Sequence, residues 1–160
     1  MQLNQKTINY WLFQGNPELY NFELAIKDNV LDAWSVTAHW TKIKEGDKAI
    51  IWLTGKNGGI GGLAQITFIN PPGETISRDA YCWTEKGKKN RENEKISWAA
   101  GIKINTNTNL FSKPIFLKKE NIQGLEKLNV GRGFQNTNYM ATENQYKIIS
   151  GLIEHSSHKL

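Results

Sequence analysis

Short stretches of alternating or β-branched apolar residues run through the chain and predict a sheet. Turn-forming residues separate them, notably Gln14-Gly15-Asn16-Pro17 and Asn70-Pro71-Pro72-Gly73. Between two of the predicted strands, Gly55 to Gly59 predicts a hairpin connection, because glycine adopts positive φ without steric cost. The predicted strands cover residues 8–13, 48–53, 60–69 and 98–104, with a short one over 115–117.

Apolar residues spaced three or four apart predict three helices. The first covers about 22–31 after an Asn21 cap, and a short one covers 119–128. The last begins at a capping box, Thr142-Glu143-Asn144-Gln145, and is followed by a frayed tail at 155–160. Its buried stripe is predicted to consist of Tyr146, Ile149, Leu152 and Ile153. Because strands dominate, the chain is interpreted as an α+β protein, a single domain over 1–160 with a core of about 8–153 and a twisted, barrel-like sheet.

The stretch from Glu85 to Lys95 is charged, mixed in sign and almost free of apolar residues. It is interpreted as a solvated loop between two strands. The alternative is a basic arm that follows a phosphate backbone.

The composition is that of a soluble globular protein and favours polyanionic partners. The chain has 160 residues, a net charge of +5 and six tryptophans, whose indole rings stack well on nucleobases. No apolar run approaches the ~20 residues that span a bilayer. Residues 1–6 lack the apolar core of a secretory signal, so a cytoplasmic location is expected. Cys82 is the only cysteine, which excludes an internal disulfide and a multi-cysteine zinc site.

The sequence offers little catalytic chemistry. Of the three histidines, His155 and His158 fall in the predicted tail, and His39 has no His or Cys at ligand spacing. The run Gly58-Gly59-Ile60-Gly61-Gly62 lies between two strands rather than between a strand and a helix, which argues against a dinucleotide fingerprint. We therefore expect no enzyme activity, no cofactor and no metal.

A binding site for a planar ligand fits the residues better. The segment from Ala33 to Trp40 is predicted to be a loop after a short helix, and loops on a rigid scaffold commonly carry binding groups. Trp34 and Trp52 are predicted to stack on a base, while Ser35 and Thr37 read its edge. For Trp52 the alternative is simple packing in the core. Lys42, Lys44, Lys56 and Arg132 are candidates for phosphate contacts.

Several segments, in order and at their spacing, resemble the EVE domain. They are Tyr10-Trp11-Leu12-Phe13, Trp34-Ser35, Ile43-Lys44-Glu45-Gly46-Asp47, Gly59-Ile60-Gly61-Gly62-Leu63-Ala64 and Gly133-Phe134-Gln135-Asn136-Thr137. The resemblance implies a PUA-like small twisted β-barrel flanked by two to four short helices, similar to YTH domains. It also implies a reader of modified nucleobases, in which Trp34-Ser35 matches a Trp-Ser pair that contributes to an aromatic cage.

The resemblance implies a function, partners and a set of site residues. The function is non-catalytic recognition of methylated or hydroxymethylated cytosine, or methyladenine, in DNA by base flipping. The alternatives are a module that binds modified RNA and a small nucleotide-processing enzyme. A nuclease or NTPase effector of a restriction system, fused or separate, is the implied protein partner. The expected base pocket is Trp34, Ser35, Trp52, Leu53, Asn16 and Phe134, the phosphate contacts are Lys42, Lys56, Asn57 and Arg132, and His39 and Trp40 support the loop.

Two segments depart from the common EVE pattern. Gln14-Gly15-Asn16-Pro17 replaces a Lys-Ser/Thr-Glu-Pro step, and Thr37-Ala38-His39-Trp40 replaces an Arg-Asn-Tyr run. Both departures fall near the expected pocket, so they bear on which base is recognised. The Gln-Gly-Asn-Pro version resembles the recognition domain of a restriction subunit.

Overall fold

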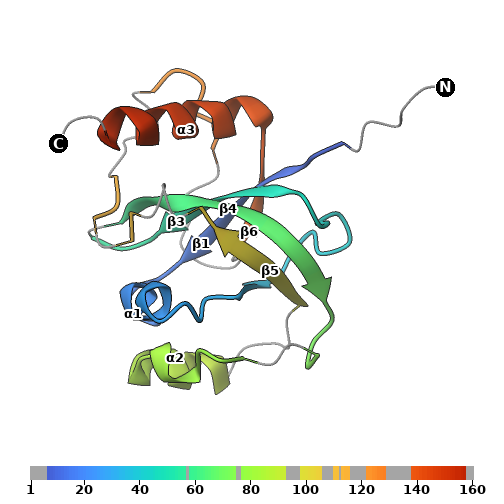
Figure 1. Cartoon of the computed structure of the whole chain (residues 1–160), viewed down its shortest axis with the longest axis vertical. Coiled ribbons are helices and arrows are strands. Elements are labelled where there is room, and N and C mark those ends of the chain that lie inside the picture. Colours follow the sequence, from blue (N-terminus) through green and yellow to red (C-terminus); the bar gives the residue numbers. More distant parts are fainter. Residues whose placement is uncertain are drawn as a thin grey trace.

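The computed structural model describes residues 7–56, 58–74, 77–92, 98–105, 110–111, 113–115, 122–128 and 138–157. Its centre is a six-stranded sheet in the order β2-β5-β4-β3-β1-β6 (Figure 1). β1 and β3 run parallel, and all other neighbours are antiparallel. The strands are β1 (Tyr10–Gly15), β2 (Ala33–Val36), β3 (Lys48–Leu53), β4 (Gly59–Asn70), β5 (Trp98–Ile104) and β6 (Asn138–Ala141).

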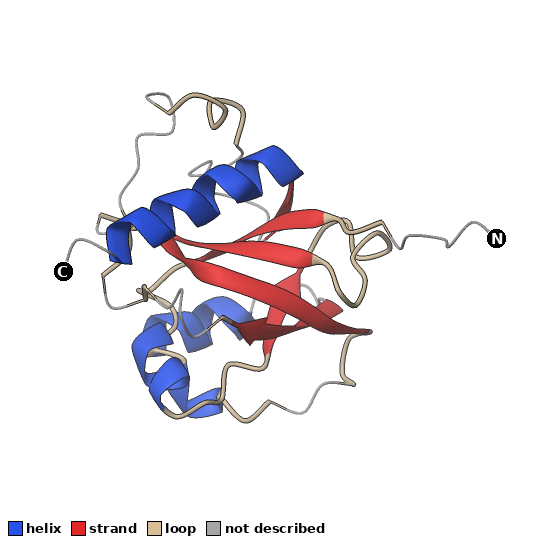
Figure 2. Cartoon of the chain, turned by 45° about the horizontal axis from the view of Figure 1, so that its top comes forward, coloured by secondary structure: helices blue, strands red, loops and turns tan. Residues whose placement is uncertain are grey.

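The helices divide between the two faces of the sheet. α3 (Glu143–Ser157) crosses one face, whereas α1 (Phe22–Lys27) and α2 (Glu85–Glu92) lie on the other side (Figures 1 and 2). A 3-10 turn, η1 (Ala80–Cys82), precedes α2. Within the described ranges, no helix combines the length and apolarity needed to cross a membrane.

Each face of the sheet has its own hydrophobic core. Successive residues of a strand point to opposite faces, and β1 shows this directly, since Trp11 and Phe13 pack beneath α1 while Leu12 packs beneath α3. β3 alternates in the same way, and five of its six residues are buried. The β1–β3 pair is therefore the buried centre of the molecule.

The sheet curls until its two edge strands meet, and Asn138 joins them. This buried residue begins β6, and its Oδ1 accepts hydrogen bonds from the backbone N–H groups of Thr37 (3.0 Å) and Ala38 (3.2 Å), directly after β2. Its Nδ2 donates to the Ala38 carbonyl. One side-chain amide thus closes the curled sheet into a half-barrel.

The predicted strands over 48–53, 60–69 and 98–104 are confirmed. The first strand runs over Tyr10–Gly15, slightly later than predicted, and the first helix ends at Lys27 rather than near 31. Of the predicted strand at 115–117, Ile115 forms a bridge to Ile60, and 116–117 lie outside the described residues.

Two predicted loops are wrong. Trp34 and Ser35 belong to β2, because they pair with Ala100 and Ala99 of β5. Residues 85–92 form α2 rather than a solvated loop. The hydroxyl of Thr84 accepts a hydrogen bond from the Gly87 N–H (3.0 Å), which caps the first turn.

The final helix is confirmed with its capping box. The Thr142 N–H donates to Gln145 Oε1 (2.9 Å), and the Gln145 N–H donates to Thr142 Oγ1 (3.1 Å). The helix continues to Ser157, so residues 155–157 are not frayed as predicted. In the predicted helix at 119–128, residues 122–128 form two successive turns instead, and 119–121 lie outside the described residues.

Candidate functional site

Trp34 lies where the parallel strands β1 and β3 end. Its indole packs nearly parallel to the rings of Phe22 (5.5 Å between centroids, 18°) and Phe13 (6.2 Å, 22°), and 6% of the residue is exposed. Gly15, the last residue of β1, lies against the edge of the indole. A β-carbon at Gly15 would be 2.9 Å from Trp34 Cζ2 and 2.5 Å from Phe22 Cζ. The ring edge therefore fills the space that a side chain at Gly15 would need.

The ends of β1 and β3 are joined by backbone contacts at this point. Gly15 is the register partner of Leu53, and its carbonyl accepts from the Thr54 N–H at 2.8 Å. Leu53 packs in the same core as Trp34. Asn16 follows Gly15, and its Oδ1 accepts from the Glu18 N–H (2.9 Å), which turns the chain toward α1. Trp34, Leu53 and Asn16 are thus brought together.

Trp52 does not share a pocket with Trp34. It belongs to the core beneath α3, with Ile60, Leu125 and Ile149. The physical reason is strand alternation, since Ile51 and Leu53 on either side of Trp52 face the Trp34 core. The predicted pairing of the two tryptophans is therefore wrong, and core packing accounts for Trp52.

Ser35 is also on the other face from Trp34. Trp34 and Val36 pack in one core, and Ser35 stands between them on β2. Its side chain therefore does not point into the space beside the indole, which leaves its backbone as the part that could contact a ligand there.

The predicted phosphate contacts are divided between the two ends of the sheet. Lys56 is exposed in the turn after β3, near the Trp34 end. Lys42 lies at the opposite end, because its carbonyl accepts from Asn9 Nδ2 (3.2 Å) just before β1. β1 has six residues, so the ends are about 20 Å apart. Lys42 and Lys56 do not form one cluster, and Asn57, Arg132 and Phe134 lie outside the described residues.

A row of aromatic rings leads from Trp34 to the helix α2. Phe22 contacts Tyr20 (4.8 Å), and Tyr20 contacts Trp83 edge-on (4.9 Å). The guanidinium of Arg91 lies over the Trp83 ring, 4.4 Å from its centroid. The indole Nε1 of Trp83 is buried and has no hydrogen-bond partner among the described residues. The row thus ends with an unpaired donor and a cation at α2.

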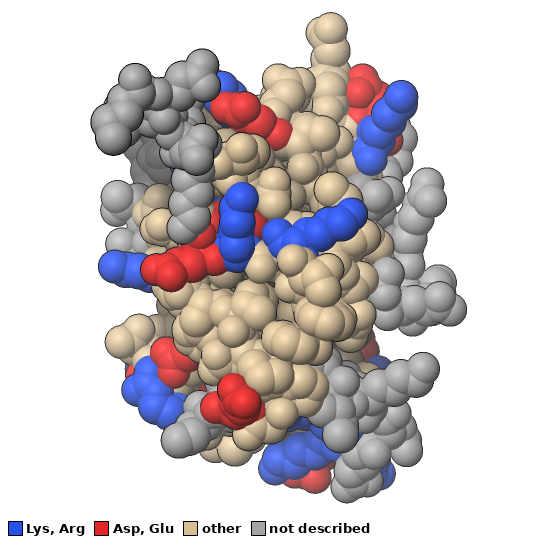
Figure 3. Space-filling view, turned by 90° about the vertical axis from the view of Figure 1, so that its right-hand side faces the viewer, with Lys and Arg blue, Asp and Glu red and all other residues tan. Residues whose placement is uncertain are grey.

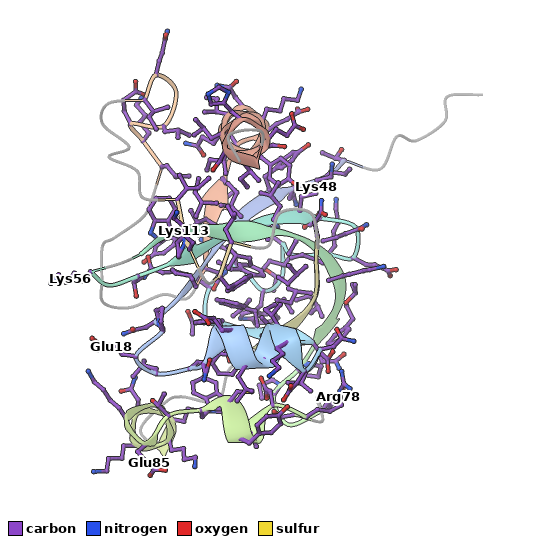
Figure 4. The ribbon with its side chains drawn as sticks, turned by 60° about the vertical axis from the view of Figure 1, so that its left-hand side comes forward. Glu18, Lys48, Lys56, Arg78, Glu85 and Lys113 are labelled. Carbon is purple, nitrogen blue, oxygen red and sulfur yellow. The ribbon has the colours of Figure 1, made fainter. Side chains whose placement is uncertain are left out.

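Hydrogen bonds hold the segment 77–86 onto the chain before and after α1. The Tyr20 hydroxyl donates to Asp79 Oδ2 (2.7 Å), and burial together with this contact raises the pKa of Tyr20 above its ordinary value. Lys86 donates to Glu18 (2.8 Å), and this hydrogen bond lowers the pKa of the Glu18 carboxyl. Lys56, Glu18 and Glu85 project on the same side of the molecule, away from Arg78 (Figure 4). Both signs of charge therefore flank this end of the sheet.

Sequence reasoning missed Trp83, Arg91 and Asn138. The only local signal for the first two was the Thr84 cap, which marks the start of α2. Asn138 had none, because its partners lie about a hundred residues away. Within the described residues, no group of three or more His, Cys, Asp or Glu side chains is placed to hold a metal ion. The Cys82 thiol is buried, and this burial raises its pKa.

The curled six-stranded sheet with helices on both faces is a PUA-like fold, as predicted. The EVE domain family model matches residues 9–152, and the chain therefore belongs to the EVE domain family. No curated protein sequence matches the chain significantly.

Solved structures share this fold at low identity. A hypothetical protein from Leishmania major has a TM-score of 0.65 and 16% identity, with coverage of 94% of this chain and 98% of that one. The DUF55 domain of human thymocyte nuclear protein 1 has a TM-score of 0.54 and 15% identity, covering 91% and 98%. The human THYN1 protein in complex with 5-methylcytosine containing DNA has a TM-score of 0.52 and 14% identity, again covering 91% and 98%.

Proposed function

We propose that this protein is a non-catalytic reader of modified bases in DNA, with the base held at the Trp34 end of the sheet. Two observations carry the proposal. The chain belongs to the EVE family, and its fold is similar to that of the human THYN1 protein, whose structure was solved in complex with 5-methylcytosine containing DNA. The net charge of +5 fits a polyanionic partner. Flipping a base out of the duplex costs a few kcal/mol, and aromatic faces and hydrogen bonds must offset this cost.

The base would contact Trp34, with Leu53, Asn16 and the backbone of Ser35 bordering it. Phe134 is proposed as a further wall. A base held between two rings needs about 7 Å between them, since carbon atoms in contact are about 3.5 Å apart. The centroids of Trp34 and Phe22 are 5.5 Å apart. Binding therefore requires Phe22, the first residue of α1, to move aside.

Phosphates beside the flipped base would be held by Lys56, with Asn57 and Arg132 as further proposed contacts. Lys56 is the one of these three that the structure describes, and it is exposed on the hairpin turn at this end of the sheet (Figure 4). Each phosphate contact releases counterions, so affinity should fall as salt is raised. Lys42, at the far end of the sheet, is not part of this group.

The proposal is tested by measuring binding to otherwise identical duplexes that carry cytosine, 5-methylcytosine, 5-hydroxymethylcytosine or N6-methyladenine. Burial of one methyl group contributes about 0.8 kcal/mol, so a simple apolar contact gives about a 4-fold preference, and a formed cage gives more. Matched RNA strands and free nucleosides are the controls for the alternative functions. Equal affinity for all the DNA duplexes, or turnover of a nucleoside, would overturn the proposal.

A further inference from the structure

A second aromatic surface lies at the opposite end of the sheet from Gly15. The indoles of Trp40 and Trp98 stack face to face, with 4.2 Å between centroids and 5° between planes. Trp98 covers one face of Trp40, yet Trp40 is 38% exposed. The exposed area therefore belongs to the other face and the edges of the Trp40 ring, an arrangement that presents a flat apolar surface to solvent.

The loop that carries Trp40 is held firmly at both ends. Asn138 binds the backbone of Thr37 and Ala38. At the other end, the buried carboxylate of Asp47 accepts from the Lys44 N–H (3.0 Å) and from Trp11 Nε1 (2.9 Å). Two buried polar residues thus fix the loop, and little conformational entropy remains to be lost when a ligand binds to it.

The turn inside this loop keeps Trp40 at the surface. His39 has a positive φ of 58°, a conformation that costs an L-residue about 1–2 kcal/mol. Its carbonyl accepts from the N–H groups of Lys42 (2.8 Å) and Ile43 (3.2 Å), so the chain reverses at Trp40 and Thr41. The prediction that Trp40 merely supports the loop does not explain why an exposed indole stands at the tip of a strained turn.

We propose that Trp40 is a stacking platform for an unpaired nucleobase of a DNA strand, separate from the base site at Trp34. The inference rests on the proposed function for its choice of DNA as the partner. A flat indole face stacks on any base, since every base has a π-face. The loop residues 37–46 carry Lys42 and Lys44 against Glu45, which suits an anionic strand. A broad area without charged side chains also lies on this side of the molecule (Figure 3).

The distance between the two surfaces suits one bound strand. Trp34 pairs with Ala100, which lies two residues along β5 from Trp98, so Trp34 and Trp98 are about 7 Å apart along the strand direction. Successive stacked nucleotides are about 3.4 Å apart, so about two nucleotide steps cover this length. A strand whose modified base enters the Trp34 site could therefore place another unpaired base on Trp40.

The test compares the wild-type chain with Trp40→Leu and Trp40→Phe. The probes are a labelled 12-nucleotide DNA single strand and duplexes with and without 5-methylcytosine, measured by fluorescence anisotropy. We expect Trp40→Leu to weaken binding of the single strand by about 5- to 150-fold, the range for one stacked base, and Trp40→Phe to recover most of the loss. Tyr81→Leu is the matched control, because Tyr81 is exposed on η1 and outside both surfaces. Near-UV circular dichroism checks that each variant is folded.

Unchanged DNA affinity in folded Trp40→Leu, or an equal loss in Trp40→Phe, would overturn the platform. If Trp40→Leu changes the oligomeric state and not the DNA affinity, a second copy of the chain covers this face. If the variant loses only RNA binding, the partner is RNA. Either result overturns the proposal. The platform contacts any unpaired base, so Trp40→Leu should leave the preference for the modified over the unmodified duplex unchanged. The wild-type chain could show no preference for 5-methylcytosine while Trp40→Leu still weakens binding of the single strand. That result would refute the proposed reader function and leave the platform standing.

Discussion

Trp34 and Trp52 pack on opposite faces of the same sheet. Trp34 lies against Phe22 on the α1 side, whereas Trp52 lies in the core beneath α3. Both are nearly buried, so both contribute to stability. Only Trp34 adjoins Gly15 and the proposed base site. The two residues therefore allow stability to be separated from recognition.

We expect Trp34→Leu and Trp52→Leu each to lower the free energy of unfolding by about 2–3 kcal/mol, because each leaves a cavity in a packed core. Only Trp34→Leu should remove the preference for a modified base. Urea denaturation gives the stability, and competition between modified and unmodified duplexes gives the preference. Recognition that survives in folded Trp34→Leu, or is lost in folded Trp52→Leu, would show that the base binds elsewhere.

Gly15→Ala should disturb the same site from the strand side. The added carbon would lie 2.5 Å from Phe22 Cζ and 2.9 Å from Trp34 Cζ2, and both rings are held in the core. We expect a loss of about 1–3 kcal/mol in unfolding free energy, as for other overpacked positions, and weaker binding of modified DNA. Thermal or urea unfolding and duplex binding measure the two effects.

Gly151→Ala is the matched control for this substitution. Gly151 lies in α3, is exposed, and a β-carbon there meets nothing within 4 Å. Alanine is the better helix former, so this variant should be more stable by about 0.5–1 kcal/mol and bind DNA normally. If Gly15→Ala is instead as stable as the wild type, the rings of Phe22 and Trp34 move more easily than their packing indicates.

The strands were predictable where the local pattern is strong. β5 matches its predicted bounds, and β4 extends them by one residue at each end, because its turn residues mark where it stops. The final helix was predictable from its capping box and apolar stripe. α2 was not, since its sequence has no apolar face and it docks instead through Gly87, whose β-carbon would lie 1.9 Å from the Leu19 carbonyl oxygen.

The residue of β3 that faces Trp34 could not be predicted either, and the reason is a different one. β3 is buried on both faces, so its sequence Lys-Ala-Ile-Ile-Trp-Leu shows no alternation of polar and apolar residues. Nothing local indicates that Trp52 faces α3 while Leu53 faces Trp34. β6 was missed because only its pairing with β1, more than a hundred residues away, makes Asn138–Ala141 a strand. Long-range pairing decided each of these features.

Asn138→Leu should open the seam between the edge strands. The variant removes three partly buried hydrogen bonds, to the N–H groups of Thr37 and Ala38 and to the Ala38 carbonyl, and each contributes about 0.5–1.5 kcal/mol. We expect a loss of about 2–4 kcal/mol in unfolding free energy, measured by urea denaturation, and faster hydrogen exchange at Thr37 and Ala38. Asn144→Ala, at an exposed position of α3, should change neither quantity. Equal stability of the two variants would mean that the seam does not depend on Asn138.

Tyr20 should make the stability depend on pH in the alkaline range. Burial, together with the hydrogen bond to Asp79, raises the pKa of Tyr20 above the ordinary value of 10.0. The folded chain thus holds this phenol neutral, while the unfolded chain ionises it above pH 10. The stabilisation is fully present below pH 10 and is lost as the pH rises further, by about 1.4 kcal/mol per pH unit.

Urea denaturation of the wild type and Tyr20→Phe between pH 8 and 11.5 isolates this effect, because every other titrating group is common to both chains. We expect the stability advantage of the wild type to be constant up to about pH 10 and then to shrink. Tyr81, whose hydrogen bond to Asp28 raises its pKa to about 12, should give a similar onset in a Tyr81→Phe comparison. Parallel stability curves for the wild type and Tyr20→Phe across this range would mean that the phenol ionises equally in the folded and unfolded chains, and that Tyr20 is not sealed between α1 and η1.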